Sequence, residues 1–467
     1  MSRSNPILRS GRGGAHLFRH QVSLGTLVLG WFLLAGALMT TGCGEPPAPP
    51  ARQTLTYTFD APTREIIRLL AEKLKAPAYE NFDKYFKGLL VPESLLPLEP
   101  FVLGLSTESK IPAVLLLDAP WVQRYGVAGW LYELEATKVF AREELAAPVA
   151  EAFSVLLPKA VGKPVKELVA VPTTIKGNIL FYRRDLLQKY QVKPPRTWDE
   201  LAAACRLILP RERQLRYGLI FHATNFMNDF YPILWGYGAE VVEGESRLVL
   251  GEKQNLEACL AALRDLKGWM GSLAPRREDL RLLEAAGSLR RTFYRGEALF
   301  MINWNTRITD LREMIRTQEG GGGALRDLSQ VGVAPIPCRA GHAHRYSNIG
   351  SFGWAVNRFA VTHPRVIEEV QRFMGLVAEE HFQLLAAEHF GQVPALRRAL
   401  KKVTNKEVLQ VYQDAFAVPD MVLKPRPFSR RLNNILEKHL VGCLFGEQTP
   451  EEALQRAIQE YKTSEGS

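Results

Sequence analysis

The sequence predicts an α/β protein with more than one domain, and three observations support this prediction. Its 467 residues exceed what a single core usually contains. Short apolar runs, such as residues 113–117, have the length and continuity of strands that are covered on both faces. Longer segments with apolar residues at helical spacing separate most of these runs, and this alternation is typical of α/β folds.

The expected elements can be followed in chain order. Residues 55–59 alternate like a strand, and an apolar-faced helix is expected over residues 63–74. Thr197 with Glu200, and Thr449 with Glu452, have the spacing of capping boxes and therefore predict helix starts. An apolar helical stripe in residues 366–377 predicts a core-facing helix. Further strands are expected at 113–117, 167–172, 217–221, 297–303, 331–337 and 352–357.

The N-terminal segment resembles an export signal. Four arginines and no acid precede a 16-residue apolar run at residues 24–39, which is short for a membrane span. The sequence "MTTGC" then ends at Cys43 and resembles a bacterial lipobox, although Thr40 stands where leucine is usual. This resemblance implies a lipoprotein signal peptide over residues 1–43 and acylation of Cys43; a plain signal peptide or a signal anchor is the alternative. The proline-rich residues 44–53 predict a stiff tether.

Composition and missing motifs exclude several function classes. Hydrophobic residues make up 46% and charged residues 23%, as in soluble globular proteins. Of the net charge of +10, four charges belong to the N-terminal arginines, and the remaining +6 (10 − 4) is spread along the chain without a basic block, so no nucleic-acid binding is predicted. No hydrolase elbow, zinc-protease or nucleotide-binding motif occurs, and the glycine run at 319–325 lacks the Lys-Ser/Thr of a phosphate loop. We therefore predict no enzyme activity and no cofactor.

The histidines predict no metal site, and the cysteines leave disulfide pairing open. His342 and His344 are close together, but no cysteine or acid cluster accompanies them, so no metal site is predicted. Cys205 and Cys259 have the apolar neighbours of core residues, and the sequence leaves open whether any of the four later cysteines, Cys205, Cys259, Cys338 and Cys443, are paired.

Seven segments between about residue 113 and residue 461 form a recognisable series: "LLLDAPWVQRYGVAGWLYELE", "AVPTTIKGNILFYRRDLLQKYQVKPPRTWDEL", "FYRGEALFMINW", "VGVAPIP", "GSFGWAVN", "QVPALRRAL" and "RPFSRRLNNI". In these segments and in their order the chain resembles the family 1 extracellular solute-binding proteins, the sugar-type receptors of ABC importers. Each segment alone is a weak signal, but seven in the same order are a strong one.

The resemblance implies a two-lobed periplasmic binding protein fold of type II, with a ligand cleft between lobes that are joined by crossing strands. On this basis the first lobe is expected to contain residues 54–171 with 331–360. The second lobe is expected to contain residues 172–330 with 361–467, including the C-terminal helices. Such a receptor closes around its solute by moving two rigid lobes about short hinges.

The resemblance also implies the residues that would bind the ligand. Aromatic faces stack on sugar rings, while amides, carboxylates and cations bind hydroxyl groups. For each tryptophan the alternative is a place in the core, and for Lys176 it is a solvated loop. The implied aromatic residues are Trp121, Trp235, Trp304, Phe352 and Trp354, and the implied polar residues are Asp118, Lys176, Asn178, Asp229, Asn303 and Arg307.

Two departures from the sugar-binding pattern modify the expected ligand. Lys176 stands where sugar-binding members often have an acid. After Asn303 and Trp304, where Pro-Tyr is common, this chain has Asn305, Thr306 and Arg307. These changes remove a carboxylate and stacking surface and add positive charge. We therefore hypothesise a solute that carries an anionic group.

The sequence as a whole predicts a lipid-anchored receptor at the extracytoplasmic face of a membrane. It would capture a carbohydrate or related polar solute and deliver it to an ABC permease with its ATPase. The alternative is a non-transporting relative that serves as a sensor or a protein-interaction scaffold. A secreted hydrolase is a third possibility that no motif supports.

Overall fold

The computed structural model describes most of the chain from residue 55 onward, and all of these residues belong to one unit, Gln53–Ser467. The predicted signal peptide at 1–43, its Cys43 and the tether at 44–53 lie outside the described residues. The described ranges are 55–59, 61–74, 86–90, 112–134, 142–157, 163–222, 226–243, 247–285, 289–318, 324–361, 363–427 and 429–465.

The first sheet is built around a strand that is buried along its whole length. This strand, β3 (Val114–Asp118), is parallel to β1 (Leu55–Phe59) and antiparallel to β15 (Phe352–Val356). The described order is β2-β1-β3-β15-β6, with β2 at Phe86–Leu90 and β6 at Ala170–Pro172. Helices α5 (Ala119–Val127) and α14 (Pro364–Val377) contact this sheet. Helices α1 (Ala61–Leu74) and α15 (Glu380–Phe390) lie beside it and contact each other.

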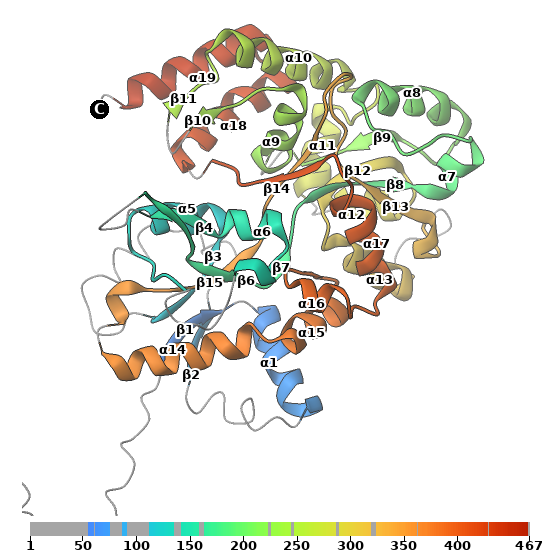
Figure 1. The fold of residues 1–467 in the computed structure, drawn as a ribbon. Coiled ribbons are helices and arrows are strands. Elements are labelled where there is room, and N and C mark those ends of the chain that lie inside the picture. Colours follow the sequence, from blue (N-terminus) through green and yellow to red (C-terminus); the bar gives the residue numbers. More distant parts are fainter. Residues whose placement is uncertain are drawn as a thin grey trace, which may run out of the picture. The chain divides into compact units, whose positions relative to one another are not determined.

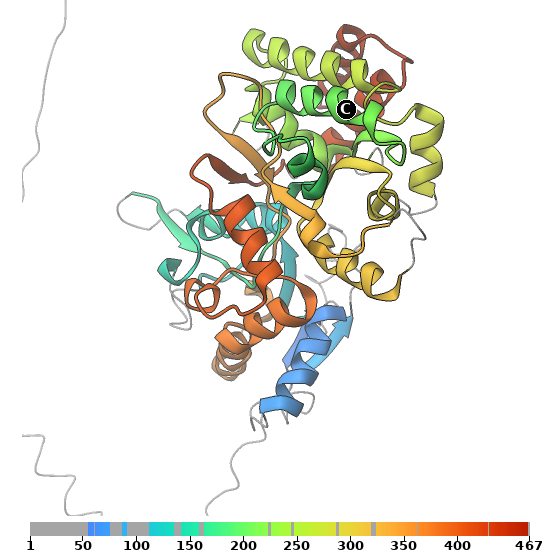
Figure 2. The ribbon, with the colours of Figure 1, turned by 90° about the vertical axis from the view of Figure 1, so that its right-hand side faces the viewer.

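The second sheet has the described order β13-β8-β12-β9. Its central pair, β8 (Asn178–Arg183) and β12 (Ala298–Trp304), is antiparallel, and β12 is parallel to β9 (Tyr217–Ile220). β13 (Val331–Ala334) completes the sheet. Helices on this side of the unit include α8 (Trp198–Ile208), α9 (Phe226–Tyr237), α10 (Lys253–Trp269), α18 (Arg430–Leu444) and α19 (Pro450–Glu465). The two sheets occupy different parts of the unit in both ribbon views (Figures 1 and 2).

Shorter elements connect these layers. Among the described residues they pair as β4 with β5, β10 with β11, β14 with β17, and β16 with β7. The strands are β4 (Ser154–Leu157), β5 (Val165–Leu168), β7 (Thr174–Ile175), β10 (Val242–Glu243), β11 (Arg247–Leu248), β14 (Arg345–Asn348), β16 (Val393–Pro394) and β17 (Met421–Lys424). The helices are α6 (Ala147–Ala152), α7 (Arg184–Lys189), α11 (Arg277–Ala285), α12 (Leu289–Tyr294), α13 (Arg307–Thr317), α16 (Arg397–Leu400) and α17 (Lys406–Val411).

The chain passes between the two sheets at three places. Residues 173–177 lead from β6 of the first sheet to β8 of the second. Residues 349–351 lead from β14, which contacts β8 and α9, to β15 of the first sheet. A third passage follows α15, because β17 pairs with β14 and α18 then packs on α9 and α10. These passages are the crossing connections of the predicted two-lobed α/β fold.

The lobe boundaries remain a prediction, and several segments pack differently from it, among them β13 and α14. Residues 331–334 form β13 of the second sheet, because their backbone pairs with β8, although they were assigned to the first lobe. Helix α14 was assigned to the second lobe but packs on the first sheet, where Phe373 contacts Trp354 and Phe86 with ring centroids 5.2 and 5.4 Å apart. The apolar stripe of this helix correctly predicted a core face, but it contained no information about which core it faces.

The predicted capping box at the start of α8 is confirmed. The backbone N–H of Glu200 donates to Oγ1 of Thr197 at 3.2 Å, and Oε2 of Glu200 accepts from the backbone N–H of Thr197 at 3.3 Å. The same reciprocal pair joins Thr449 and Glu452. Two otherwise unpaired helix-end donors are thereby satisfied in each case.

We expect Thr197→Ala to lower the free energy of unfolding by about 1 kcal/mol, because one first-turn N–H loses its acceptor. Urea denaturation measures this loss. Thr463→Ala is the matched control, because the Thr463 hydroxyl bonds only to carbonyls of its own helix, at 3.1 and 3.0 Å. Equal losses in the two variants would contradict the capping role.

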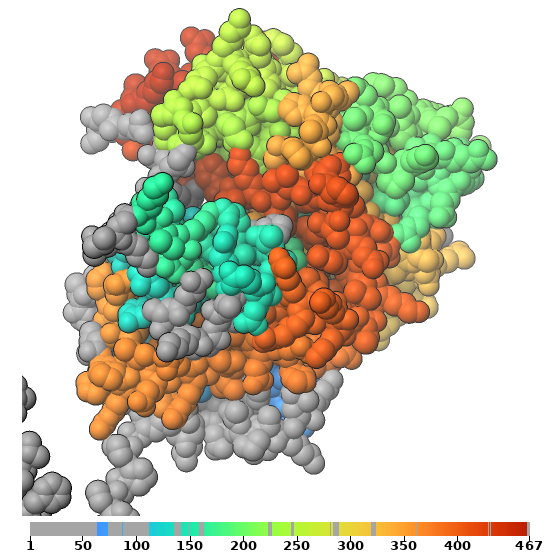
Figure 3. All heavy atoms as spheres, in the orientation of Figure 1, coloured from blue at the N-terminus to red at the C-terminus, as the bar shows by residue number. Residues whose placement is uncertain are grey.

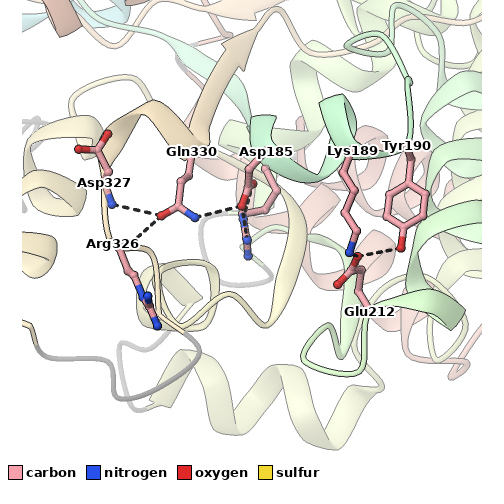
Figure 4. A network of polar contacts seen from close by, with 8 residues as sticks. Asp185, Lys189, Tyr190, Glu212, Arg326, Asp327 and Gln330 are labelled. Carbon is pink, nitrogen blue, oxygen red and sulfur yellow. Dashed lines mark hydrogen bonds and ion pairs between the residues drawn. The ribbon is translucent and has the colours of Figure 1, made fainter.

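A polar network fastens α7 to the neighbouring chain (Figure 4). The Gln330 side chain donates to Oδ2 of Asp185 at 3.1 Å, which ties the start of α7 to the turn before β13. Nearby, Tyr190 donates to Oε1 of Glu212 at 2.8 Å, and Lys189 forms an ion pair with the same carboxylate. These bonds hold the pKa of Glu212 below its ordinary value. Because the network's side chains bond to one another, we assign it a structural role.

The four cysteines in the described part of the chain are buried free thiols, which confirms the prediction for Cys205 and Cys259. Burial raises the pKa of Cys205 to about 12, so this thiol stays protonated at neutral pH. Cys338 and Cys443, whose state the sequence left open, are also unpaired. Within the described ranges, no helix combines the length and apolar character that a bilayer span needs.

Candidate functional site

Two of the passages between the sheets lie side by side and are fixed to each other. The backbone N–H of Lys176 donates to Oγ of Ser351 at 3.0 Å, and the backbone N–H of Gly350 donates to the carbonyl of Lys176 at 2.8 Å. The side chain of Asn305 braces the same loop by accepting from the N–H of Gly177 at 3.0 Å. A Cβ at residue 177 would lie 2.5 Å from Oγ of Ser347, so only glycine fits this close approach. The loop that carries Lys176 is therefore held rigidly.

The Lys176 ammonium lies over two aromatic rings. Its Nζ is 5.2 Å from the ring centroid of Trp304 and 5.3 Å from that of Phe352. Both rings are half-buried. A Cβ at Gly350 would lie 2.3 Å from the six-membered ring of Trp304, so the backbone also packs closely against this ring. Together these contacts form a cation–π cluster at the ends of β12 and β15.

Asp118 and Arg426 form an ion pair beside this cluster. Asp118 ends β3 and caps α5, where its Oδ1 accepts from the N–H of Ala119 at 2.9 Å. Its Oδ2 accepts from Arg426 at 3.1 Å, and Arg426 also donates to Oδ1 of Asn228 at the start of α9. Burial raises the pKa of Asp118, and the charges of Arg426 and Lys176 oppose this rise. Arg426 therefore joins a first-sheet residue to a second-sheet helix.

A buried network continues from this point into the second sheet. The amide of Asn178 donates to Oδ1 of Asp229 and, at 3.3 Å, to the carbonyl of Asn228. The other oxygen of Asp229 accepts from the backbone N–H of His222 at 3.0 Å. Oδ1 of Asn178 is buried without a hydrogen-bond partner among the described residues. Polar groups in protein cores are normally hydrogen-bonded, so the unpaired Oδ1 of Asn178 is an exception to this rule.

A cavity of about 650 Å³ lies between α5, the α9–β11 region and the extended chain after β17. One wall is Trp235, whose ring lies 5.0 Å from Nζ of Lys424. Lys424 also bonds to Oε2 of Glu240 at 2.6 Å. Lys424 and Arg426 line the cavity together with the two prolines that follow them, Pro425 and Pro427. Figure 3 shows this orange-red part of the chain running between the teal and the yellow-green parts.

The structure brings several predicted site residues together. Lys176, Trp304 and Phe352 are in contact, and Asp118 interacts electrostatically with Lys176. Asn178 and Asp229 are bonded to each other. Trp235 lines the cavity together with Arg426.

Four predicted residues lie elsewhere. Trp354 is 1% exposed and packs on Phe373, and Trp121 is buried against Tyr125 with ring centroids 5.3 Å apart. Asn303 is buried and accepts from the N–H of Trp304 at 2.9 Å. Arg307 bonds to Asp310 at 3.2 Å, one turn along its own helix. We revise the predicted site accordingly, since the first three are enclosed by protein and the fourth has a local partner.

Sequence reasoning missed the residues that complete the cavity. Glu240 is far in sequence from Lys424 and Arg426, which share one segment and line the same cavity. Asn228, which accepts from Arg426, lies next to the predicted Asp229. The prolines of "KPRP" (residues 424–427) were the available signal, because proline enforces an extended chain with alternating faces. In the described ranges, no group of three His, Cys, Asp or Glu side chains is placed to hold a metal ion.

Comparison with protein families gives one match that covers more than half of the chain. The model of the family described as "Bacterial extracellular solute-binding protein" matches residues 106–380. A curated relative from Deinococcus radiodurans, named "Probable ABC transporter-binding protein", is 24% identical over 277 residues. That match covers 58% of this chain and 57% of the relative's length.

Solved structures resemble this chain over most of its length. The maltose-bound MalE3 of T. maritima has a TM-score of 0.64 at 22% identity, covering 88% of this chain and 99% of that one. The sugar-binding protein MalE of Xanthomonas citri has a TM-score of 0.67 at 14% identity, covering 87% and 96%. At these identities the similarity establishes the fold, which is the two-lobed architecture expected from the sequence.

Proposed function

Because the chain belongs to the bacterial extracellular solute-binding protein family, we propose that it is the substrate-binding component of an ABC importer. It captures a carbohydrate or related polar organic solute in the cavity beside Arg426 and delivers it to a membrane permease, whose ATPase supplies the energy. The names of the relatives, which include an ABC transporter-binding protein and sugar-binding receptors, support this proposal.

The single observation that carries the proposal is the composition of the cavity wall. Residues from α5, which follows the first sheet, and from α9 and β10 beside the second sheet face the same space. Carboxylate and ammonium groups, such as the Glu240–Lys424 pair, can accept from and donate to solute hydroxyls. A cavity of about 650 Å³ is within the range that small-molecule ligands occupy.

The family places the protein outside the cytoplasm. We further propose that Cys43 carries the lipid that anchors it to the membrane and that residues 44–53 form the tether. In this proposal the protein binds and releases its solute without chemical change, because no cofactor or catalytic motif enters the mechanism.

The proposal is tested by calorimetric titration of the mature protein with a panel of mono- and oligosaccharides and polyols. We expect at least one member to bind with a dissociation constant in the micromolar range or below. Mass spectrometry of small molecules that co-purify with the protein provides an independent identification. Absence of both binding and a co-purifying polar solute would refute the proposed function.

We expect Lys424→Gln to weaken binding of that solute by about tenfold, because a charge-assisted hydrogen bond in the cavity is lost. Lys438→Gln is the matched control, because Lys438 pairs with Glu460 on the surface of α18. Titration of both variants with the same solute measures the difference. Unchanged affinity in Lys424→Gln would show that the solute binds outside this cavity.

A further inference from the structure

We propose that the solute carries an aliphatic group beside its polar part, so that the preferred ligand is an alkyl glycoside or a similar amphipathic molecule rather than the bare sugar. This inference rests on the proposed function and names the ligand class of the same cavity. It is carried by the lining of the cavity, because the elements that form its walls contribute both apolar and hydrogen-bonding side chains.

The first step concerns helix α5, which forms one wall. Its residues in the lining have the spacing of a single helix face: Pro120, Gln123, Arg124 and Val127. This face is polar in the middle and apolar at both ends. Pro120 is buried, whereas Val127 is 43% exposed, so the aliphatic side chain of Val127 offers surface to a ligand.

The second step concerns the walls contributed by β10 and by the segment after β17. Val242 of β10 is half-buried and lines the cavity, and so do Pro425 and Pro427. The two prolines alternate along the chain with two cations, Lys424 and Arg426. An aliphatic group that covers the apolar side chains removes their surface from water, which is favourable. A volume of about 650 Å³ leaves room for such a group beside a sugar.

The third step concerns Trp235, the aromatic residue in the described lining of the cavity. This residue is only 3% exposed. Its ring stacks on Tyr231 with ring centroids 5.6 Å apart, and the ammonium of Lys424 lies 5.0 Å from its centroid. The ring therefore has little surface left on which a sugar could stack. The apolar contact that this lining offers to a ligand is aliphatic.

The fourth step concerns the charge of the solute. Three cations of the lining already bond to carboxylates of the protein: Lys424 to Glu240, Arg426 to Asp118 and Arg247 to Glu252. Such pairs donate to and accept from hydroxyl groups, and they require no charge on the solute. The anionic group hypothesised from Lys176 and Arg307 stays a prediction, because neither residue is among the described residues that line this cavity. The polar part that suits this lining is therefore a neutral one, such as a sugar.

Calorimetric titration of the mature protein with glycosides of increasing chain length tests the inference. The probes are methyl, propyl and pentyl β-D-glucoside and the corresponding β-D-galactosides. Complete burial of one methylene corresponds to about a fourfold gain in affinity. We expect the pentyl member of at least one series to bind at least tenfold more tightly than the methyl member. Pentanol, which lacks the sugar, should bind at least tenfold more weakly than that pentyl glycoside.

Variants of the cavity wall then assign this gain to the apolar lining. Val127→Thr keeps the shape of the side chain and adds a hydroxyl, so we expect the pentyl-to-methyl affinity ratio to fall at least threefold. Val242→Thr should lower the ratio in the same way from another wall. Val165→Thr is the matched control, because Val165 is 45% exposed on β5 and is not among the residues of the lining. Its ratio should equal that of the wild type.

Each outcome bears on the proposal. Equal affinity of the pentyl and methyl glycosides, pentanol binding as tight as that of the pentyl glycoside, or a ratio that survives both wall variants overturns the inference and leaves the proposed function intact. If no glycoside binds, the solute identified by the sugar panel or by co-purification decides. A solute with an aliphatic substituent supports the inference, and one without it overturns the inference. If no solute binds or co-purifies, both the inference and the proposed function fail.

Discussion

Arg426→Leu is expected to reduce solute affinity by at least tenfold and to lower the free energy of unfolding by about 2 kcal/mol. Arg426 lines the cavity, bonds to Asp118 at 3.1 Å and also bonds to Asn228. Its removal leaves the buried carboxylate of Asp118 without its directly bonded cation. Binding suffers because a cavity donor and the connection between the two sides of the cavity are lost together.

The pH dependence of this loss has a defined sign. Burial already raises the pKa of Asp118 above its ordinary value, and removing Arg426 raises it further. A carboxyl whose pKa is higher in the folded state binds more protons there, so its effect on stability becomes less favourable as pH rises through that raised pKa. The destabilisation by Arg426→Leu should therefore be larger at pH 7 than near pH 5.

Urea denaturation at both pH values measures the stability effect, and titration measures affinity. Adding Asp118→Asn to Arg426→Leu should recover part of the stability, because the uncompensated charge disappears, but it should not recover affinity. Arg431→Leu, on the exposed face of α18, is the control and should change neither quantity. A double variant no more stable than Arg426→Leu alone would contradict the ion-pair explanation.

Arg345→Met is expected to lower the free energy of unfolding by about 3 kcal/mol at pH 7. Arg345 is 5% exposed, and its guanidinium binds both oxygens of Asp420 at 2.8 Å. The backbone N–H of Arg345 also donates to the carbonyl of Asp420 at 2.8 Å. This double clamp fixes the beginning of β17 to β14, so the substitution removes a bidentate ion pair and leaves the partly buried Asp420 with the exposed Arg196 as its remaining cation.

The contribution of this pair should disappear in acid. The hydrogen bond from Arg345 holds the pKa of Asp420 below its ordinary value. A carboxyl whose pKa is lower in the folded state stabilises the protein above its unfolded pKa, about 3.9, and loses that contribution as pH falls through the folded pKa. The stability difference between wild type and Asp420→Asn should thus be largest at neutral pH and shrink below pH 4.

Denaturation curves of wild type and Asp420→Asn between pH 7 and pH 3 measure this trend. Glu451→Gln is a suitable comparison, because its partner Arg264 is exposed and such surface pairs contribute little. A difference for Asp420→Asn that stays constant with pH would contradict the ion-pair role of Asp420.

Much of the fold could be predicted because its signals are local. The apolar run of β3, the capping boxes of α8 and α19, and the stripe of α14 each depend on neighbouring residues, and each lies where the sequence placed it. The assignment of α14 to one lobe failed because it depends on contacts such as Phe373 with Trp354, which the helix's own pattern does not encode. Strand β13 was misplaced for the same reason, since its partner is β8.

Site residues could be predicted only where one sequence segment shows both a suitable side chain and its position at the end of a strand. Asp118 and Trp304 end strands and Lys176 directly follows one, so their place at strand ends could be expected. Trp354 was also predicted, but two residues further along β15 its ring lies in the core, where it packs on Phe373. Arg426 could not be found in this way, because its partner Asp118 lies 308 residues earlier in the chain.

This separation affects how the molecule is made. Strands of both sheets are synthesised well before the ribosome reaches residue 420, so the growing chain can form its layers while the wall that carries Lys424 and Arg426 does not yet exist. Contacts between such distant residues close large loops and tend to form late. A nascent chain halted before residue 420 is therefore expected to contain ordered secondary structure and yet retain no sugar, so that binding competence arises only in the last steps of translation.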